Sequence, residues 1–227
     1  SLTEGTEQVD LKPLYRFAFP VVIALLFLNS YCQLDVALVR RFYGDTAEGL
    51  ILSGYYATAS IVGKGFFFLP LGIILIIFPK VARMKALGES PLPLLKRWLL
   101  IEIGLSVTGI ILAIILSRHI AMILGKTASP SPDLVGLIKM FGIAITPIAA
   151  TTILVNYNLA DERYGFLWLL LPMTFLTFLI ICLYHPSPMS VLLTIMAGGF
   201  ILFISISMFT FLPVRVKRAL PEVSAVS

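Results

Sequence analysis

The chain has 227 residues, of which 59% are hydrophobic and only 13% are charged, and its mean hydropathy is +0.99. Ordinary soluble domains carry about 25% charged residues, so this composition does not provide a water-facing surface. The net charge of +5 does not indicate nucleic-acid binding, because the cations lie between hydrophobic runs and not on one basic face. Composition therefore excludes a soluble domain and predicts an all-α protein embedded in a membrane.

Six apolar runs follow one another along the chain, and each exceeds the ~17 residues needed to cross the hydrocarbon core. The runs are continuous and lack the alternation of barrel strands, so we expect transmembrane helices. Residues 1–13 form a polar N-terminal segment, residues 14–212 the six-helix transmembrane domain, and residues 213–227 a cytoplasmic tail. The expected spans are Leu14–Val39, Leu52–Phe78, Trp98–Leu116, Leu134–Tyr157, Phe166–Tyr184 and Ser190–Leu212.

Lysine and arginine are distributed unevenly between the two ends of the expected bundle. The termini and the loops on their side hold 11 of these residues, whereas the opposite loops hold 4. Cytoplasmic loops are enriched in Lys and Arg, so we expect a multi-pass protein of the cytoplasmic membrane with both termini in the cytoplasm. The basic segment Pro79–Arg97 is expected to be a loop against anionic headgroups, and Lys126–Asp133 a Pro/Ser turn on the outer side.

Lys64 lies near the middle of the second run, on the order of 20 Å of helix from either end. An ionisable side chain at that depth costs at least ~2.5–3.5 kcal/mol unless it faces protein or water. Ser53, Tyr56, Ser60 and Lys64 recur at helical spacing and so share one stripe. We expect this stripe to line a cavity in which the cation meets an anionic group of the cargo. The alternative is a lysine that snorkels, or that is held by backbone carbonyls and a neighbouring carboxylate.

The first run carries Asn29 and Gln33 on one face, whereas Asp35 lies about 160° round from Gln33. Asp35 is expected near the outer rim, so a direct ion pair with Lys64 is not expected. Such a pair would need helix tilt, or a first helix that continues past Arg41. Asp35 is expected to cap the outer loop, to pair with Arg41 or the arginine before it, or to take part in ion coupling.

Small and polar residues share a face on the third span and again on the fourth. Such residues let helices approach closely in lipid, so both faces favour a helix–helix seam. Pro147 removes a backbone hydrogen bond and is expected to kink the fourth span, either as a moving part or as a static bend. Glu102 and Pro147 join Asp35 as candidates for coupling or gating. The two faces are Glu102, Ser106, Gly109 and Ala113, then Gly142, Thr146 and Ala150.

Enzyme chemistry finds little support in the sequence. His119 and His185 lie at the outer ends of spans without an acidic or cysteine partner at metal-binding spacing. The chain has no HExxH, GxSxG or P-loop pattern. Cys32 and Cys182 lie inside apolar runs without CxxC spacing and are expected to be buried apolar residues. We therefore expect no enzyme activity, no cofactor and no metal site.

Four motifs follow one another from Asp35 onward: D-x-x-L-V-x-x-F, G-Y-Y-A-x-A-S-I-V-G-K, F-L-P and I-I-F-P-K-V-A. In this order they resemble the polysaccharide-exporter branch of the multidrug/oligosaccharidyl-lipid/polysaccharide flippase superfamily, which is related to the MATE transporters. Beyond Arg97 the likeness rests on the number and spacing of spans. The matching positions are Asp35, Leu38, Val39, Phe42, Gly54–Lys64, Phe68–Pro70 and Ile76–Ala82.

Members of this superfamily typically have two six-helix lobes around a central cavity. The resemblance implies that the chain is the C-terminal lobe, and that a missing N-terminal lobe or partner chain supplies the other. It implies flipping or export of a lipid-linked oligosaccharide or polysaccharide precursor by alternating access. The partners would be the lipid-linked sugar and membrane lipids, with no nucleic acid. Lys64 would offset the lipid phosphate, while other polar residues would bond sugar hydroxyls: Tyr56, Ser60, Asn29 and Gln33.

Two alternatives stay open. A MATE-like cation-coupled drug exporter would favour carboxylates in its cavity, and the deep positive charge counts against it. A truncated, non-transporting membrane scaffold would follow if the first lobe is absent.

Overall fold

The computed structural model describes residues 12–125 and 128–212, and within these ranges the chain is helical with no strand. The expected segment 1–13 lies almost wholly outside the described residues, as do Lys126 and the tail 213–227. The helices are α1 (Lys12–Tyr43), α2 (Ala47–Ala86), α3 (Leu92–Gly125), α4 (Pro132–Ala144), α5 (Thr146–Ala160), α6 (Leu167–Leu183) and α7 (Pro188–Phe211), with a 3-10 turn η1 (Tyr164–Phe166) before α6.

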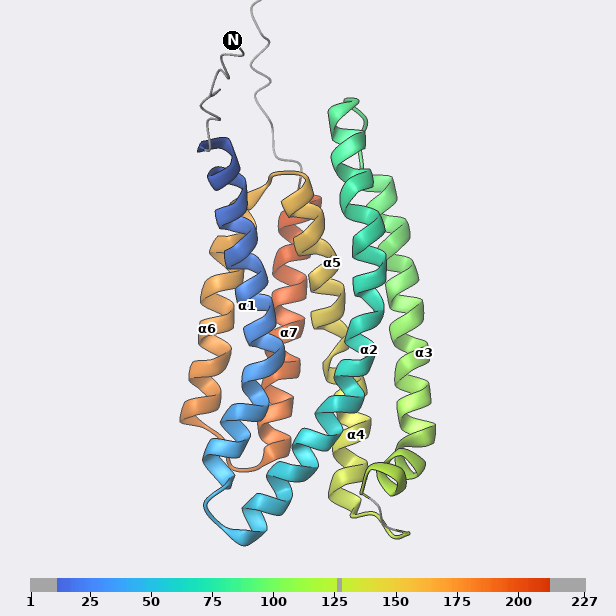
Figure 1. The fold of residues 1–227 in the computed structure, drawn as a ribbon, viewed down its shortest axis with the longest axis vertical. Helices are drawn as coiled ribbons and strands as arrows, with labels where there is room; N and C mark the ends of the chain where they lie inside the picture. Colours follow the sequence, from blue (N-terminus) through green and yellow to red (C-terminus); the bar gives the residue numbers. More distant parts are fainter. Residues whose placement is uncertain (1–11, 126–127, 213–227) are drawn as a thin grey trace, which may run out of the picture.

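The helices form one bundle in which α1, α3 and α6 run in one direction and α2, α4, α5 and α7 in the other (Figure 1). α5 follows α4 directly and continues in the same direction. α1 begins at the end of the bundle where α7 ends. Five stretches of the described chain are long and apolar enough to cross a membrane: 15–43, 92–125, 132–160, 164–183 and 188–211. The structure is therefore that of an all-α protein with membrane-spanning helices. α2 is not among these five stretches, so the predicted second span is not confirmed.

Several helices extend beyond the predicted spans. The predicted loop Pro79–Arg97 is wrong, because α2 continues to Ala86 and α3 begins at Leu92. Gly88, with φ +74°, makes the turn between the two helices. Apolar runs stop where polar residues begin, but lysine and arginine are good helix formers, so a helix continues through them into water.

α2 is the longest element, with 40 residues. At 1.5 Å per residue it measures about 60 Å, roughly twice the ~30 Å hydrocarbon thickness of a bilayer. Figure 1 shows its first part running obliquely and its last turns, with the start of α3, standing beyond the ends of α5 and α7. Thr46 caps the helix start by accepting a hydrogen bond from the Gly49 N–H.

α5 is the central helix of the bundle, because every residue from Pro147 to Ala160 is buried. It contacts α2, α3 and α7. The fourth span, in which Pro147 is expected to cause a kink, is divided at Ile145, where α4 ends and α5 begins with Pro147 in its first turn. Thr146 donates its hydroxyl to the Gly142 carbonyl at 3.2 Å across the break.

Small residues bring α3 and α2 close to α4. A Cβ placed on Gly142 would lie 2.9 Å from the Cβ of Ala113, and one on Gly63 would lie 2.7 Å from the Cβ of Phe141. The small-residue faces predicted on the third and fourth spans thus meet each other at Ala113 and Gly142, a pairing that the sequence analysis did not specify.

Large apolar side chains cover the outer surface of the bundle, as expected for helices that face lipid. Examples are Ile115 on α3, Phe175 on α6 and Ile204 on α7, all exposed. Cys182 also lies on this surface, so its predicted burial is wrong, whereas Cys32 is buried; both thiols are free.

Candidate functional site: a cavity beside a buried ion pair

A cavity of about 390 Å³ lies between α1, α2 and α5. It combines apolar walls with lysine, amide and hydroxyl side chains, although the surrounding helices are strongly apolar. Its lining residues are Leu25, Leu28, Asn29, Cys32, Gln33, Lys64, Ile74, Leu75, Thr152 and Asn156.

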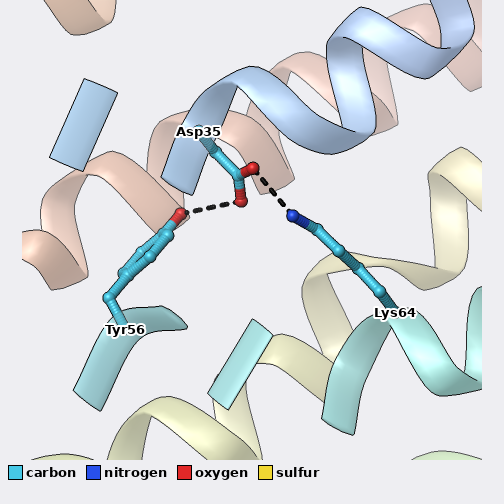
Figure 2. A network of polar contacts seen from close by, with 3 residues as sticks. All are labelled: Asp35, Tyr56 and Lys64. Carbon is cyan, nitrogen blue, oxygen red and sulfur yellow. Dashed lines mark hydrogen bonds and ion pairs between the residues drawn. The ribbon is translucent and has the colours of Figure 1, made fainter. Parts of the chain in front are cut away.

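Lys64 forms a buried ion pair at the edge of this cavity. Its Nζ lies 2.8 Å from Oδ1 of Asp35, and the Tyr56 hydroxyl donates to Oδ2 of the same carboxylate at 3.2 Å (Figure 2). The three residues are 8%, 2% and 0% exposed for Lys64, Asp35 and Tyr56. Both oxygens of the carboxylate therefore have a donor. The prediction that Asp35 and Lys64 would not pair directly is wrong.

The pair forms through the two conditions that the sequence could not settle. α1 continues past Arg41 to Tyr43, and α2 starts obliquely (Figure 1). Along the helix axes, Asp35 lies about 12 Å from the end of α1 and Lys64 about 25 Å from the start of α2. Because the first part of α2 runs obliquely, Lys64 reaches the level of Asp35 despite its greater distance along the helix (Figure 1). An Asp35–arginine pair is also not found: Arg40 donates to Ser53 at 3.5 Å, and Arg41 meets Asp45 at 3.8 Å.

Tyr56 and Ser60 are buried, but neither lines the cavity, so their predicted contact with cargo is not supported. The ring of Tyr56 packs edge-on against Phe141, with 5.0 Å between ring centroids. Burial and this contact fix the direction of the hydroxyl. Tyr56 therefore places a hydrogen-bond donor against Asp35.

Asn29 and Gln33 line the cavity together, as their shared face predicted. Asn29 donates one amide N–H to the Leu25 carbonyl at 2.8 Å. On α5, Asn156 donates to the Thr152 carbonyl at 2.8 Å. Each amide thus commits one N–H to its own helix and keeps its carbonyl oxygen and second N–H for a ligand.

Thr152 and Asn156 are cavity residues that the sequence analysis did not select. They lie four residues apart on α5 and so share a face, which is the pattern that could have found them. Asn158, two residues beyond Asn156 on α5, points elsewhere and donates to the Thr210 hydroxyl on α7 at 2.7 Å.

Glu102 and Pro147 lie away from the cavity lining. Glu102 is 2% exposed on the buried face of α3. Ser106 donates to its Oε1 at 2.9 Å, and its Oε2 has no hydrogen-bond partner. Pro147 packs against α7, where its Cγ would lie 3.4 Å from a Cβ on Gly199.

His185 has a packing role at one end of the bundle. Its ring stacks on Phe42 with 3.9 Å between centroids, and its carbonyl accepts the Tyr43 hydroxyl. Among the described residues, no group of three His, Cys, Asp or Glu side chains could hold a metal ion.

Comparison with family models, with curated proteins and with solved structures finds no match to this chain. The fold thus defines a class, an all-α protein with membrane-spanning helices, and the likeness to the flippase superfamily rests on the motif residues alone.

Proposed function

We propose that the chain is one lobe of a transporter that flips or exports a lipid-linked oligosaccharide or polysaccharide precursor across the cytoplasmic membrane. The observation that carries the proposal is the cavity in which Asn29, Gln33, Asn156 and Lys64 come together. Polar and ionisable side chains are costly inside membrane helices and mark substrate pathways. In this proposal α2 also crosses the membrane, which brings the number of spans from five to six.

Sugar hydroxyls both donate and accept hydrogen bonds, and amide side chains do the same. The three amides of the cavity therefore match a sugar head group. The apolar wall residues Leu28 and Ile74 offer contact to the C–H faces of the rings, while the lipid tail stays in the bilayer. Without such a path, moving the polar head group through hydrocarbon would be prohibitive.

A second lobe is part of the proposal. Asn29 and Gln33 are exposed on the cavity side of α1, and such side chains are unfavourable against acyl chains. A missing N-terminal lobe or partner chain that covers this face would complete the cavity. Rocking of the two lobes would then expose it to each side in turn.

A drug exporter of the MATE type is less well supported. The positive charge of Lys64 no longer argues against it, because Asp35 balances that charge at 2.8 Å. However, none of the residues that line the cavity is a carboxylate. A cationic drug would therefore lack a counter-charge in contact with it.

Translocation of a lipid-linked sugar tests the proposal in vesicles that contain the chain together with its other lobe. We expect Asn156→Leu and Gln33→Leu each to lower the rate by about tenfold or more, because a site built to hydrogen-bond a ligand loses that bond. Thr108→Val is the matched control, since Thr108 is an exposed hydroxyl on α3 that donates to its own helix. Equal rates in the cavity variants and the control would refute the proposal.

A further inference from the structure

We propose that the Asp35–Lys64 pair is an exchangeable lock for a phosphate group. A phosphate or diphosphate in the cavity replaces Asp35 as the ion-pair partner of the Lys64 ammonium. The carboxylate of Asp35 then keeps its hydrogen bond from the Tyr56 hydroxyl. The inference rests on the proposed function only for the source of the phosphate, which would be the linkage between the sugar and its lipid.

The two charges of the pair differ in their access to the cavity. Lys64 is a lining residue, whereas Asp35 and Tyr56 are not. Figure 2 shows the ammonium and the tyrosine hydroxyl reaching the carboxylate from separate points of α2. A ligand in the cavity therefore contacts the ammonium, whereas the carboxylate is not part of the lining. This access selects an anionic ligand.

For Lys64, exchange of one anionic partner for another costs less than loss of its partner. A buried ammonium left alone is strongly destabilising, but one that passes from one anion to another keeps its counter-charge throughout. Lysine suits this exchange because its charge lies on a flexible stem with three rotatable donors. Among the described residues, Lys64 is the only cation within ion-pair distance of Asp35.

Tyr56 makes the released state of Asp35 tolerable. Its hydroxyl donates to Oδ2, whereas Lys64 binds Oδ1, so the tyrosine bond survives when the ammonium leaves. A buried carboxylate without any donor would bear the full desolvation penalty. The hydroxyl thus lowers the free energy of the state in which the phosphate is bound.

The exchange links cargo binding to helix contact. Asp35 lies on α1 and Lys64 on α2, so the pair ties these helices together beside the cavity. Binding of the phosphate breaks the ion pair between α1 and α2, and release of the phosphate lets Asp35 and Lys64 pair again. Binding and release of cargo would therefore alternate with loosening and tightening of the α1–α2 contact.

Inorganic pyrophosphate is the probe, titrated by calorimetry into the purified full chain in nanodiscs of phosphatidylcholine. We expect Asp35→Asn to raise the affinity at least about tenfold, because the competing carboxylate is gone, and Tyr56→Phe to lower it several-fold. Lys64→Met should abolish binding, and Asp35→Glu should bind like the parent chain. If the three residues had only a structural role, all the substitutions would change the affinity for pyrophosphate in the same direction.

The double variant Asp35→Asn/Lys64→Met removes both charges and serves as a folded reference without binding. If Asp35→Asn does not strengthen binding, or Lys64→Met retains it, the lock is refuted. If pyrophosphate binds only in phosphatidylcholine and phosphatidylglycerol displaces it, the site belongs to lipid headgroups and the cargo assignment is wrong. Binding as expected without sugar translocation would refute the proposed function and leave the lock intact.

Discussion

Asp35 shows how much one carboxylate can depend on its partners inside a membrane bundle. Two donors from α2 satisfy its two oxygens, and one of these donors carries a full charge. A buried ion pair adds little net stability compared with apolar residues of similar volume, but breaking one is strongly destabilising. We therefore do not expect the pair to be retained for its net contribution to stability.

Stability measurements on Asp35 and Lys64 test this interpretation. We expect Asp35→Ala to lower the free energy of unfolding by about 3–5 kcal/mol, because it leaves the ammonium buried and uncompensated. The double variant Asp35→Leu/Lys64→Met should come within about 1 kcal/mol of the parent chain or exceed it. Unfolding in detergent with a chemical denaturant provides the comparison.

The exposed pair of Arg41 and Asp45 is the matched control. Its side chains are 78% and 84% exposed and lie 3.8 Å apart, so Asp45→Ala should leave the stability almost unchanged. A double variant as unstable as Asp35→Ala would contradict the argument.

The close contact between α4 and α3 depends on Gly142, which has no side chain to separate the two helices. Gly142→Ala would place a Cβ 2.9 Å from that of Ala113, and such overpacking typically costs about 1–3 kcal/mol. Gly104→Ala on α3 is the control, because no atom lies within 4 Å of its added Cβ. We expect thermal unfolding to show a lower Tm for Gly142→Ala and an unchanged or higher Tm for Gly104→Ala. The same Tm shift in both variants would rule out close helix contact as the cause.

The break between α4 and α5 has a separate test. Pro147→Ala supplies an N–H to the carbonyl four residues earlier and so favours one continuous helix. If the break is a moving part of transport, the variant should fold normally and translocate sugar more slowly. A translocation rate equal to that of the parent chain would identify the break as a static bend.

Helix positions were predictable because lipid demands long apolar runs, but their ends were not. The run that ended at Phe78 continues as helix to Ala86, where charged residues replace apolar ones without breaking the backbone pattern. The Lys64 stripe was predictable from its spacing, and burial of Ser53, Tyr56, Ser60 and Lys64 confirms that this face points inward. The pairing of Asp35 was not predictable, because it depends on the direction of α2 and not on spacing.

At the scale of the whole molecule, the two ends of the bundle differ in charge. The α2–α3 end carries Lys80, Arg83, Lys85, Lys96 and Arg97, and α1 begins and α7 ends on the same side (Figure 1). The positive-inside rule predicts that this end faces the cytoplasm. In a chain with Cys32→Ala and Cys182→Ala, we expect a membrane-impermeant maleimide to label Asp45→Cys from outside the cell and Glu89→Cys only in inverted vesicles. The reverse pattern would invert the orientation.

The length of α2 has a mechanical consequence. Lys64 and Ala86 belong to one unbroken helix and lie about 33 Å apart along it. Near the far end, Lys85 donates to the Asp161 carbonyl at 2.6 Å, which fastens the tip to the end of α5. Because no loop separates Lys64 from Ala86, a displacement at the turn between α2 and α3 would be passed along α2 toward Lys64.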